Sequence, residues 1–198
     1  IEKYIEPPKK LKEITDELVV INLVTMVNNN KIDVISSYIT YKENDEIIIQ
    51  PPVYHPFFYA VNNHGRKLVQ NTLIDTDEGY VMDFGLLEQQ AKTAKMLILS
   101  NPHNPVGRSW REEELLRLGE ICLKNDVLVF SDEIHCDLVM PGFKHVPFAS
   151  LSDEFAMNSI TAHAASKTFN LAGMATSTII IPNEDLRKKY TDFVHSTE

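Results

Sequence analysis

The regular alternation of short apolar segments with longer amphipathic ones most constrains what this chain can fold into. The segment Val127–Phe130 is apolar throughout, as is typical of a strand covered on both faces. The preceding segment Arg111–Lys124 carries apolar residues at helical spacing, and Met96–Ser100 before it is another short apolar run. This pattern predicts βαβ units and therefore an α/β fold with a mostly parallel sheet sandwiched by helices.

The same rhythm extends over most of the chain. Residues 1–20 are charged and broken by prolines, and we expect them to form an N-terminal arm. Residues 21–198 contain no mark of a second domain and are long enough to form one sizeable core. We expect further strands at Glu46–Gln50, Lys67–Ile74, Ser159–His163 and Thr176–Ile181, and helices at Ile32–Tyr41, Val53–Asn63, Asp83–Lys92 and Glu184–His195.

Composition excludes several classes of protein. The net charge of −9 disfavours non-specific binding to nucleic acid or to an anionic membrane surface. No run approaches the ~20 apolar residues that a membrane-spanning helix needs. Cys122 and Cys136 are too few for a disulfide scaffold, so a cytoplasmic location is expected.

Polar residues gather where three of the predicted strands end. Ser100–Pro105 and Ser131–His135 each follow an apolar strand, and Lys167 follows the strand Ser159–His163. The carboxyl ends of parallel strands share one edge of a sheet, where ligands of open α/β folds bind. We therefore expect an amine, a carboxylate, an imidazole and amide groups to lie along one rim.

A lysine and an acid on one rim suit carbonyl chemistry through a Schiff base. Pyridoxal phosphate requires a lysine for its aldehyde and an acid that keeps its ring nitrogen protonated. Lys167 and Asp132 are the candidates for these two roles. Tyr54 follows another strand and offers an aromatic face for the cofactor ring.

Each of these residues also has a simpler interpretation. A single lysine such as Lys167 is most often a solvated surface residue. Asp132 could cap a turn, and Tyr54 could pack in the core. The cluster Glu133, His135, Cys136 and Asp137 contains metal-ligating residue types, but it is too tightly spaced on an extended segment for all to face one ion. No metal site is predicted.

Four segments occur in the order seen in a known family: Gln50–Phe57, Ser100–Arg108, Ser131–Leu138 and Ser166–Gly173. On these motifs the chain resembles fold-type I pyridoxal-phosphate enzymes of the class I/II aminotransferase group, and within it the MalY/PatB branch of cystathionine β-lyases (C–S lyases). The resemblance implies the large, cofactor-binding domain of that fold.

The resemblance assigns roles to six residues. Lys167 would form the internal aldimine with the cofactor and remove the substrate α-proton, and Asp132 would pair with the pyridine nitrogen. Tyr54 would stack on the ring. The remaining three would hydrogen-bond the cofactor: Asn104 and His135 near the phenolic oxygen, and Ser166 at the phosphate.

Two departures from the family pattern are visible. The loop that cradles the phosphate in relatives corresponds to Met26–Asn30, which contains no glycine. The chain ends soon after the predicted sheet, so the family's C-terminal small domain is expected to be missing. The chain would then be a fragment or a truncated gene product.

The resemblance implies a C–S β-lyase that cleaves cystathionine-like or cysteine thioethers to a thiol, pyruvate and ammonia through Lys167. Relatives also imply a small amino-acid substrate and a homodimer. Two alternatives stay open. The first is an aminotransferase of the same family, and the second is a catalytically inactive binding or regulatory module.

Overall fold

A computed structural model describes residues 21–24, 42–63, 65–174 and 176–196 of the chain. The expected arm at 1–20, the expected helix Ile32–Tyr41 and the phosphate loop Met26–Asn30 all lie outside these residues.

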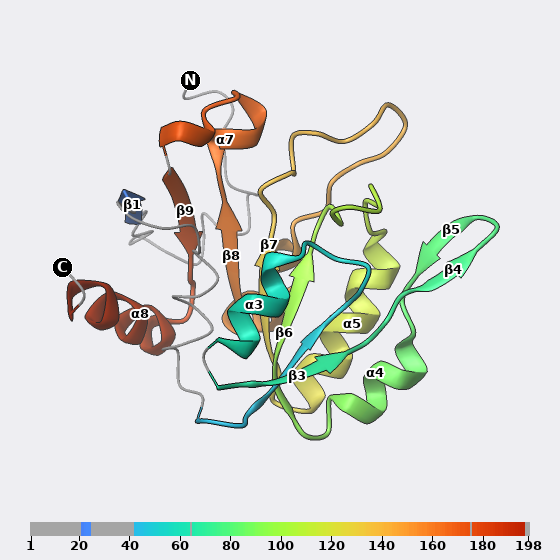
Figure 1. The fold of residues 1–198 in the computed structure, drawn as a ribbon, viewed down its shortest axis with the longest axis horizontal. Helices are drawn as coiled ribbons and strands as arrows, with labels where there is room; N and C mark the ends of the chain where they lie inside the picture. The colour runs from blue at the N-terminus through green and yellow to red at the C-terminus, as the bar shows by residue number, and fades with distance from the viewer. Residues whose placement is uncertain (1–20, 25–41, 64, 175, 197–198) are drawn as a thin grey trace.

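A seven-stranded sheet forms the centre of the described structure (Figure 1). The five strands from β3 to β8 in the sheet are parallel, whereas β9 and β1 run antiparallel to their neighbours. The predicted α/β fold with a mostly parallel sheet is therefore confirmed. The strands, in their order across the sheet, are β1 (Ile21–Val24), β9 (Thr176–Ile180), β8 (Ser159–His163), β7 (Leu128–Asp132), β6 (Ala94–Ser100), β2 (Glu46–Ile49) and β3 (Lys67–Gln70).

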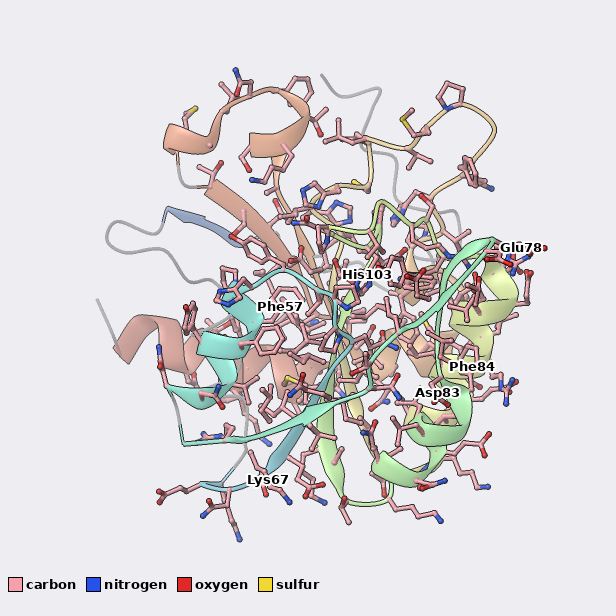
Figure 2. All side chains as sticks on the ribbon, turned by 45° about the vertical axis from the view of Figure 1, so that its right-hand side comes forward. Phe57, Lys67, Glu78, Asp83, Phe84 and His103 are labelled. Atoms are coloured by element: carbon pink, nitrogen blue, oxygen red, sulfur yellow. The ribbon has the colours of Figure 1, made fainter. Side chains whose placement is uncertain are left out.

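Helices cover both faces of this sheet because its central strands β2, β6 and β7 are apolar on both sides. Ile47 and Ile49 of β2 pack with the helices α3 and α8, while Ile48 between them packs with α4, α5 and α6 on the opposite face. Figure 2 shows Phe57 of α3 among the side chains of the layer that contains Ile47 and Ile49. The helices are α3 (Pro56–Asn62), α4 (Phe84–Gln90), α5 (Glu112–Lys124), α6 (Asp153–Met157), α7 (Ala165–Thr168) and α8 (Glu184–Ser196), with short 3-10 turns at Phe148–Ser150 and Ala172–Met174.

None of the helices in the described ranges is long and apolar enough to cross a membrane.

The predicted strand Lys67–Ile74 is wrong beyond Gln70. Asn71 ends β3, because its side-chain amide accepts a hydrogen bond from Gln50 Nε2 at 3.2 Å and donates one to the Asp83 carbonyl at 3.1 Å. The chain then forms an antiparallel hairpin of β4 (Ile74–Thr76) and β5 (Gly79–Val81), which the sequence pattern did not predict. Figure 2 shows Glu78 at the tip of this hairpin, away from the sheet.

Two helices also begin later than predicted. The helix expected from Val53 begins at Pro56, whose missing N–H is tolerated in a first turn. The helix expected from Asp83 begins at Phe84, because Asp83 is its N-cap and accepts a hydrogen bond from the Leu86 N–H at 2.9 Å. Both differences lie at helix starts, and only that of α4 is set by a side-chain cap.

The helix α5 approaches α6 closely at Gly119. A Cβ atom at this position would overlap the ring of Phe155, which in turn stacks on Phe148 with ring centroids 5.4 Å apart. We expect Gly119→Ala to lower the free energy of unfolding by about 1–3 kcal/mol, because the stacked rings cannot move aside without strain. Urea unfolding followed by circular dichroism measures this change.

Gly85→Ala is the matched control for this prediction. Gly85 lies in α4, and a Cβ atom there would make only an ordinary contact, 3.5 Å from Asp83 Oδ1. Alanine is favoured over glycine in a helix by up to about 1 kcal/mol, so this variant should unfold at the same or a higher urea concentration. A Gly119→Ala protein as stable as the wild type would contradict the packing argument.

Candidate cofactor-binding site

Three neighbouring strands end level with one another. Ser100 of β6 is paired with Asp132 of β7, and Asp132 is paired with Ala162 of β8. The alignment continues past the strands, because the Asn101 N–H donates to the Asp132 carbonyl and the Glu133 N–H to the Ala162 carbonyl, each at 2.9 Å. The short helix α7 follows β8 at this same edge (Figure 1). The backbone therefore brings the ends of these strands, where the polar residues were expected, to one edge of the sheet.

The chain changes direction across the sheet after β2, so this edge contains a topological switch point. From β2 the chain passes to β3 on one side and then returns to β6 on the other. Loops leaving neighbouring strands at such a switch point separate and commonly create a ligand site. Here the two loops remain in contact, because His103 Nε2 lies 3.0 Å from the Pro52 carbonyl oxygen. This contact holds the segment that carries Tyr54 beside the one that carries Asn104.

Asp132 and Tyr54 belong to the same face of the sheet. Leu128 and Phe130 of β7 pack in the layer of α3 and α8, and strand alternation places Asp132 on that side. Asp132 is 7% exposed and accepts a hydrogen bond from the Ile134 N–H at 3.3 Å. Tyr54 is 41% exposed, and its ring meets the Phe57 ring edge-on at 5.7 Å. A buried carboxylate and an accessible aromatic ring thus flank this edge.

Lys167 lies in α7 and is exposed. Its amine is close enough to His135 to affect that residue. The pKa of His135 is lowered, first by burial and second by the positive charge of Lys167. A neutral His135 can both donate and accept a hydrogen bond at neutral pH. The exposure of Lys167 fits a surface lysine as well as a cofactor lysine, so its role stays a prediction.

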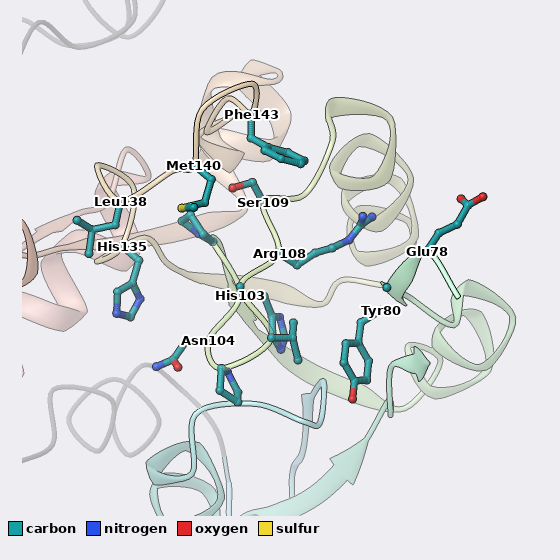
Figure 3. A pocket seen from close by; sticks show the side chains of 15 residues that line it. Glu78, Tyr80, His103, Asn104, Arg108, Ser109, His135, Leu138, Met140 and Phe143 are labelled. Atoms are coloured by element: carbon teal, nitrogen blue, oxygen red, sulfur yellow. The ribbon is translucent and has the colours of Figure 1, made fainter. Parts of the chain in front are cut away.

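A pocket of about 430 Å3 lies beside the rim. It is bounded by the β4–β5 hairpin and by the loops that follow β6 and β7 (Figure 3). Asn104 and His135 line it from the two loops. The other four predicted residues lie outside its lining. The structure therefore brings Asn104 and His135 into one cavity, and places the others along the adjoining edge by the strand topology.

Ser166 precedes Lys167 in the first turn of α7 and is half-buried. Its carbonyl oxygen accepts a hydrogen bond from the Leu171 N–H at 2.9 Å, which closes the turn after the helix. The predicted contact of Ser166 with a phosphate group is not tested by this geometry.

Sequence reasoning missed a polar network on the opposite face of β7. Glu133 is fully buried and accepts hydrogen bonds from the Ser131 hydroxyl at 2.8 Å and the Phe148 N–H at 2.9 Å. His145 Nε2 lies 2.9 Å from Glu133 Oε2, and His163 Nε2 lies at 3.7 Å, an ion-pair distance rather than a short hydrogen bond.

The network keeps Glu133 ionised. Burial alone would raise its pKa, but the contacts with His145 and His163 and the Phe148 N–H hold the pKa at about 2. The sequence did contain one signal for this network. Glu133 directly follows an apolar strand, and a carboxylate that is buried there needs hydrogen-bond or ion-pair partners. Its two histidine partners lie in distant segments, and no spacing rule identifies them.

The residues weighed as metal ligands point in different directions. Glu133 faces the buried network and His135 lines the pocket. Asp137 accepts a hydrogen bond from the Thr168 hydroxyl at 2.7 Å. Residues 134–137 form a turn rather than the expected extended segment, and the Cys136 N–H donates to the Glu133 carbonyl at 3.0 Å. Cys136 lies on the side of the network, with its sulfur 3.4 Å from His163 Nδ1.

Comparison with known proteins places the chain in a family. Residues 18–196 match the model of aminotransferase class I and II. The chain is 51% identical over 149 residues to cystathionine beta-lyase PatB of Bacillus subtilis, covering 74% of this chain and 38% of that protein. It is 32% identical over 156 residues to aspartate aminotransferase of the same organism, covering 78% and 39%.

A solved structure shows the same architecture. The structure of cystalysin from Treponema denticola, which contains a pyridoxal 5'-phosphate cofactor, matches with a TM-score of 0.83 and 41% identity, over 90% of this chain and 45% of that one. The chain belongs to the class I and II aminotransferase family. The matched part covers less than half the length of each of these relatives.

The residues at the rim fit pyridoxal phosphate. Lys167 supplies an accessible amine, and Asp132 supplies a carboxylate shielded from water. Tyr54 offers an exposed ring on the same face as Asp132, while Asn104 and His135 offer neutral hydrogen-bonding groups from the adjoining pocket. These are the residue types that the predicted roles around the cofactor ring require.

Proposed function

We propose that this chain carries the cofactor-binding part of a pyridoxal-phosphate-dependent C–S β-lyase that acts on cystathionine-like or cysteine thioethers. The observation that carries this proposal is the 51% identity to a cystathionine beta-lyase over 149 residues. The pyridoxal 5'-phosphate in the cystalysin structure supports the choice of cofactor. The products would be a thiol, pyruvate and ammonia.

When bound, pyridoxal phosphate withdraws electrons from the carbon atoms of an attached amino acid. The residues of the chain would then divide the remaining work. Lys167 would hold the cofactor aldehyde and later carry the substrate α-proton on Nζ. The Asp132 carboxylate, which is removed from water, would keep a proton on the pyridine nitrogen.

The other predicted residues would position the ring. Tyr54 would pack against one ring face, and its contact with Phe57 limits the movement of its side chain. Asn104 and His135 would hydrogen-bond the ring oxygen, and the lowered pKa of His135 keeps its imidazole neutral for this task. Ser166 would contact the phosphate.

The decisive experiment is incubation of the chain with pyridoxal phosphate and cystathionine in the absence of a keto acid. We expect pyruvate to accumulate, measured by coupling to lactate dehydrogenase, with an equal amount of thiol measured colorimetrically. An aminotransferase needs a keto-acid acceptor and releases no thiol. Product that appears only after a keto acid is added would overturn the lyase proposal.

The aminotransferase remains the second candidate, because the chain is also 32% identical to an aspartate aminotransferase. A catalytically inactive binding module would bind the cofactor without either product, or would not bind it. We also expect a homodimer, which light scattering of the purified chain would test.

A further inference from the structure

A cysteine completes the buried network behind the rim. Cys136 Sγ lies 3.4 Å from His163 Nδ1, and the other ring nitrogen of His163 lies 3.7 Å from Glu133 Oε2. We call Cys136, His163 and Glu133 the thiol–histidine cluster. The histidine bridges a sulfur and a carboxylate, which is the arrangement that activates a nucleophilic thiol in other proteins.

The charges in the cluster favour a protonated imidazole. Burial opposes the charge on His163, but the contacts with Cys136 and Glu133 raise its pKa to about 10. A protonated imidazole donates a hydrogen bond from each of its nitrogens. Its Nδ1–H therefore points a donor and a positive charge at the Cys136 sulfur, 3.4 Å away.

The two cysteines of the chain differ sharply in their surroundings. Cys136 is half-buried and the side chain of His163 is 33% exposed, so the cluster is partly open to solvent. Cys122 is completely buried in α5, and burial raises its thiol pKa to about 12. Cys122 is thus an internal reference for an unreactive thiol in the same folded chain.

We propose that the thiol–histidine cluster is a modification site at which Cys136 exchanges with small disulfides. The Cys136 sulfur attacks one sulfur of the disulfide R–S–S–R. A Cys136–S–S–R bond forms as the original S–S bond breaks, and the released thiolate takes the proton held by His163. One thiol and one disulfide are consumed, and one of each is produced, so no further oxidant is needed.

The test treats the folded chain with 2-hydroxyethyl disulfide at pH 7 and follows the adduct by intact mass and peptide mapping. We expect one adduct, at Cys136, which dithiothreitol removes and which Cys136→Ser abolishes. Cys136 should react at least about tenfold faster than the same cysteine in a synthetic peptide of residues 132–140. A rate equal to or below that of the peptide, or no adduct, would overturn the proposal.

The His163→Gln variant tests the role of the histidine. We expect its Cys136 rate to fall about tenfold, because the positive charge beside the sulfur is lost. The control His55→Gln alters an exposed histidine that packs against Tyr59, outside the cluster, and should react like the wild type. Because Cys122 is buried in the folded chain, the absence of an adduct at Cys122 shows that each variant is folded. An unchanged rate in folded His163→Gln would contradict the proposed cluster, and the peptide comparison decides the question if that variant does not fold.

Discussion

Lys167→Ala is expected to abolish the visible absorbance that pyridoxal phosphate acquires on binding, and to lower lyase activity by at least about a thousandfold. The lysine is the amine predicted to react with the cofactor aldehyde, and alanine leaves no nucleophile in its place. Its closeness to His135 puts the amine at the edge where Asp132 ends its strand. Absorbance titration with the cofactor and the pyruvate assay measure the two effects.

Lys95→Ala is the matched control. Lys95 is exposed near the amino end of β6, at the edge of the sheet opposite the predicted site. This variant should keep both the absorbance and the activity of the wild type. Retention of the absorbance in Lys167→Ala would show that another amine binds the cofactor, and the assigned site would then be wrong. A wild-type protein that acquires the absorbance but releases no thiol would instead count against the lyase assignment.

Glu133→Ala is expected to destabilise the fold by about 3–5 kcal/mol. The substitution leaves the Ser131 hydroxyl and the Phe148 N–H without their acceptor in a buried place. It also removes the negative charge that lies beside His145 and His163. Urea unfolding of the wild type and the variant, at pH 5.5, measures the difference.

The pH dependence of this difference follows from the two shifted pKa values. Glu133 has a pKa of about 2 in the folded chain against an ordinary value of 4.5, so its contribution is present above pH 4.5 and is lost as the pH falls toward 2. His163 has a pKa of about 10 against 6.5, so its contribution is present below pH 6.5 and is lost as the pH rises toward 10. The gap between the two proteins should be largest between pH 4.5 and 6.5.

Comparison of the two proteins also removes an unrelated effect. Burial lowers the pKa of His103 to about 4, which reduces the stability of both proteins as the pH falls below 6.5. This contribution cancels in the difference between wild type and variant. A difference that stays constant from pH 3 to pH 9 would contradict the proposed ionisation of the network.

The fold was predictable where hydrophobic pattern alone decides the structure. The apolar run around Val129 and the striped helix α5 were assigned from the sequence, because burial on both faces of a strand and on one face of a helix leaves a clear period. The hairpin β4–β5 was not, because its strands are exposed or half-buried and carry no apolar alternation. The end of β3 depends on side-chain hydrogen bonds of Asn71, which no periodicity records.

The site was predictable only in part for a similar reason. The edge that carries Asp132 and Lys167 follows from strand order, which the alternation of elements already implies. The partners of Glu133 do not follow, because His145 comes from a loop and His163 from the neighbouring strand. Contacts between segments far apart in the sequence require the folded arrangement.

Asp132 and Glu133 are consecutive acids at the end of β7, and strand geometry turns them to opposite sides of the sheet. A slip of β7 by one residue against β6 and β8, with Glu133 in the place of Asp132 and Asp132 in the place of Ser131, would turn each acid to the opposite face of the sheet. Glu133 would then sit where the cofactor ring is expected, and Asp132, with its shorter side chain, would face the histidines. Chemical function at this edge therefore depends on the backbone pairing of Ser100, Asp132 and Ala162 as much as on the identity of the acids themselves.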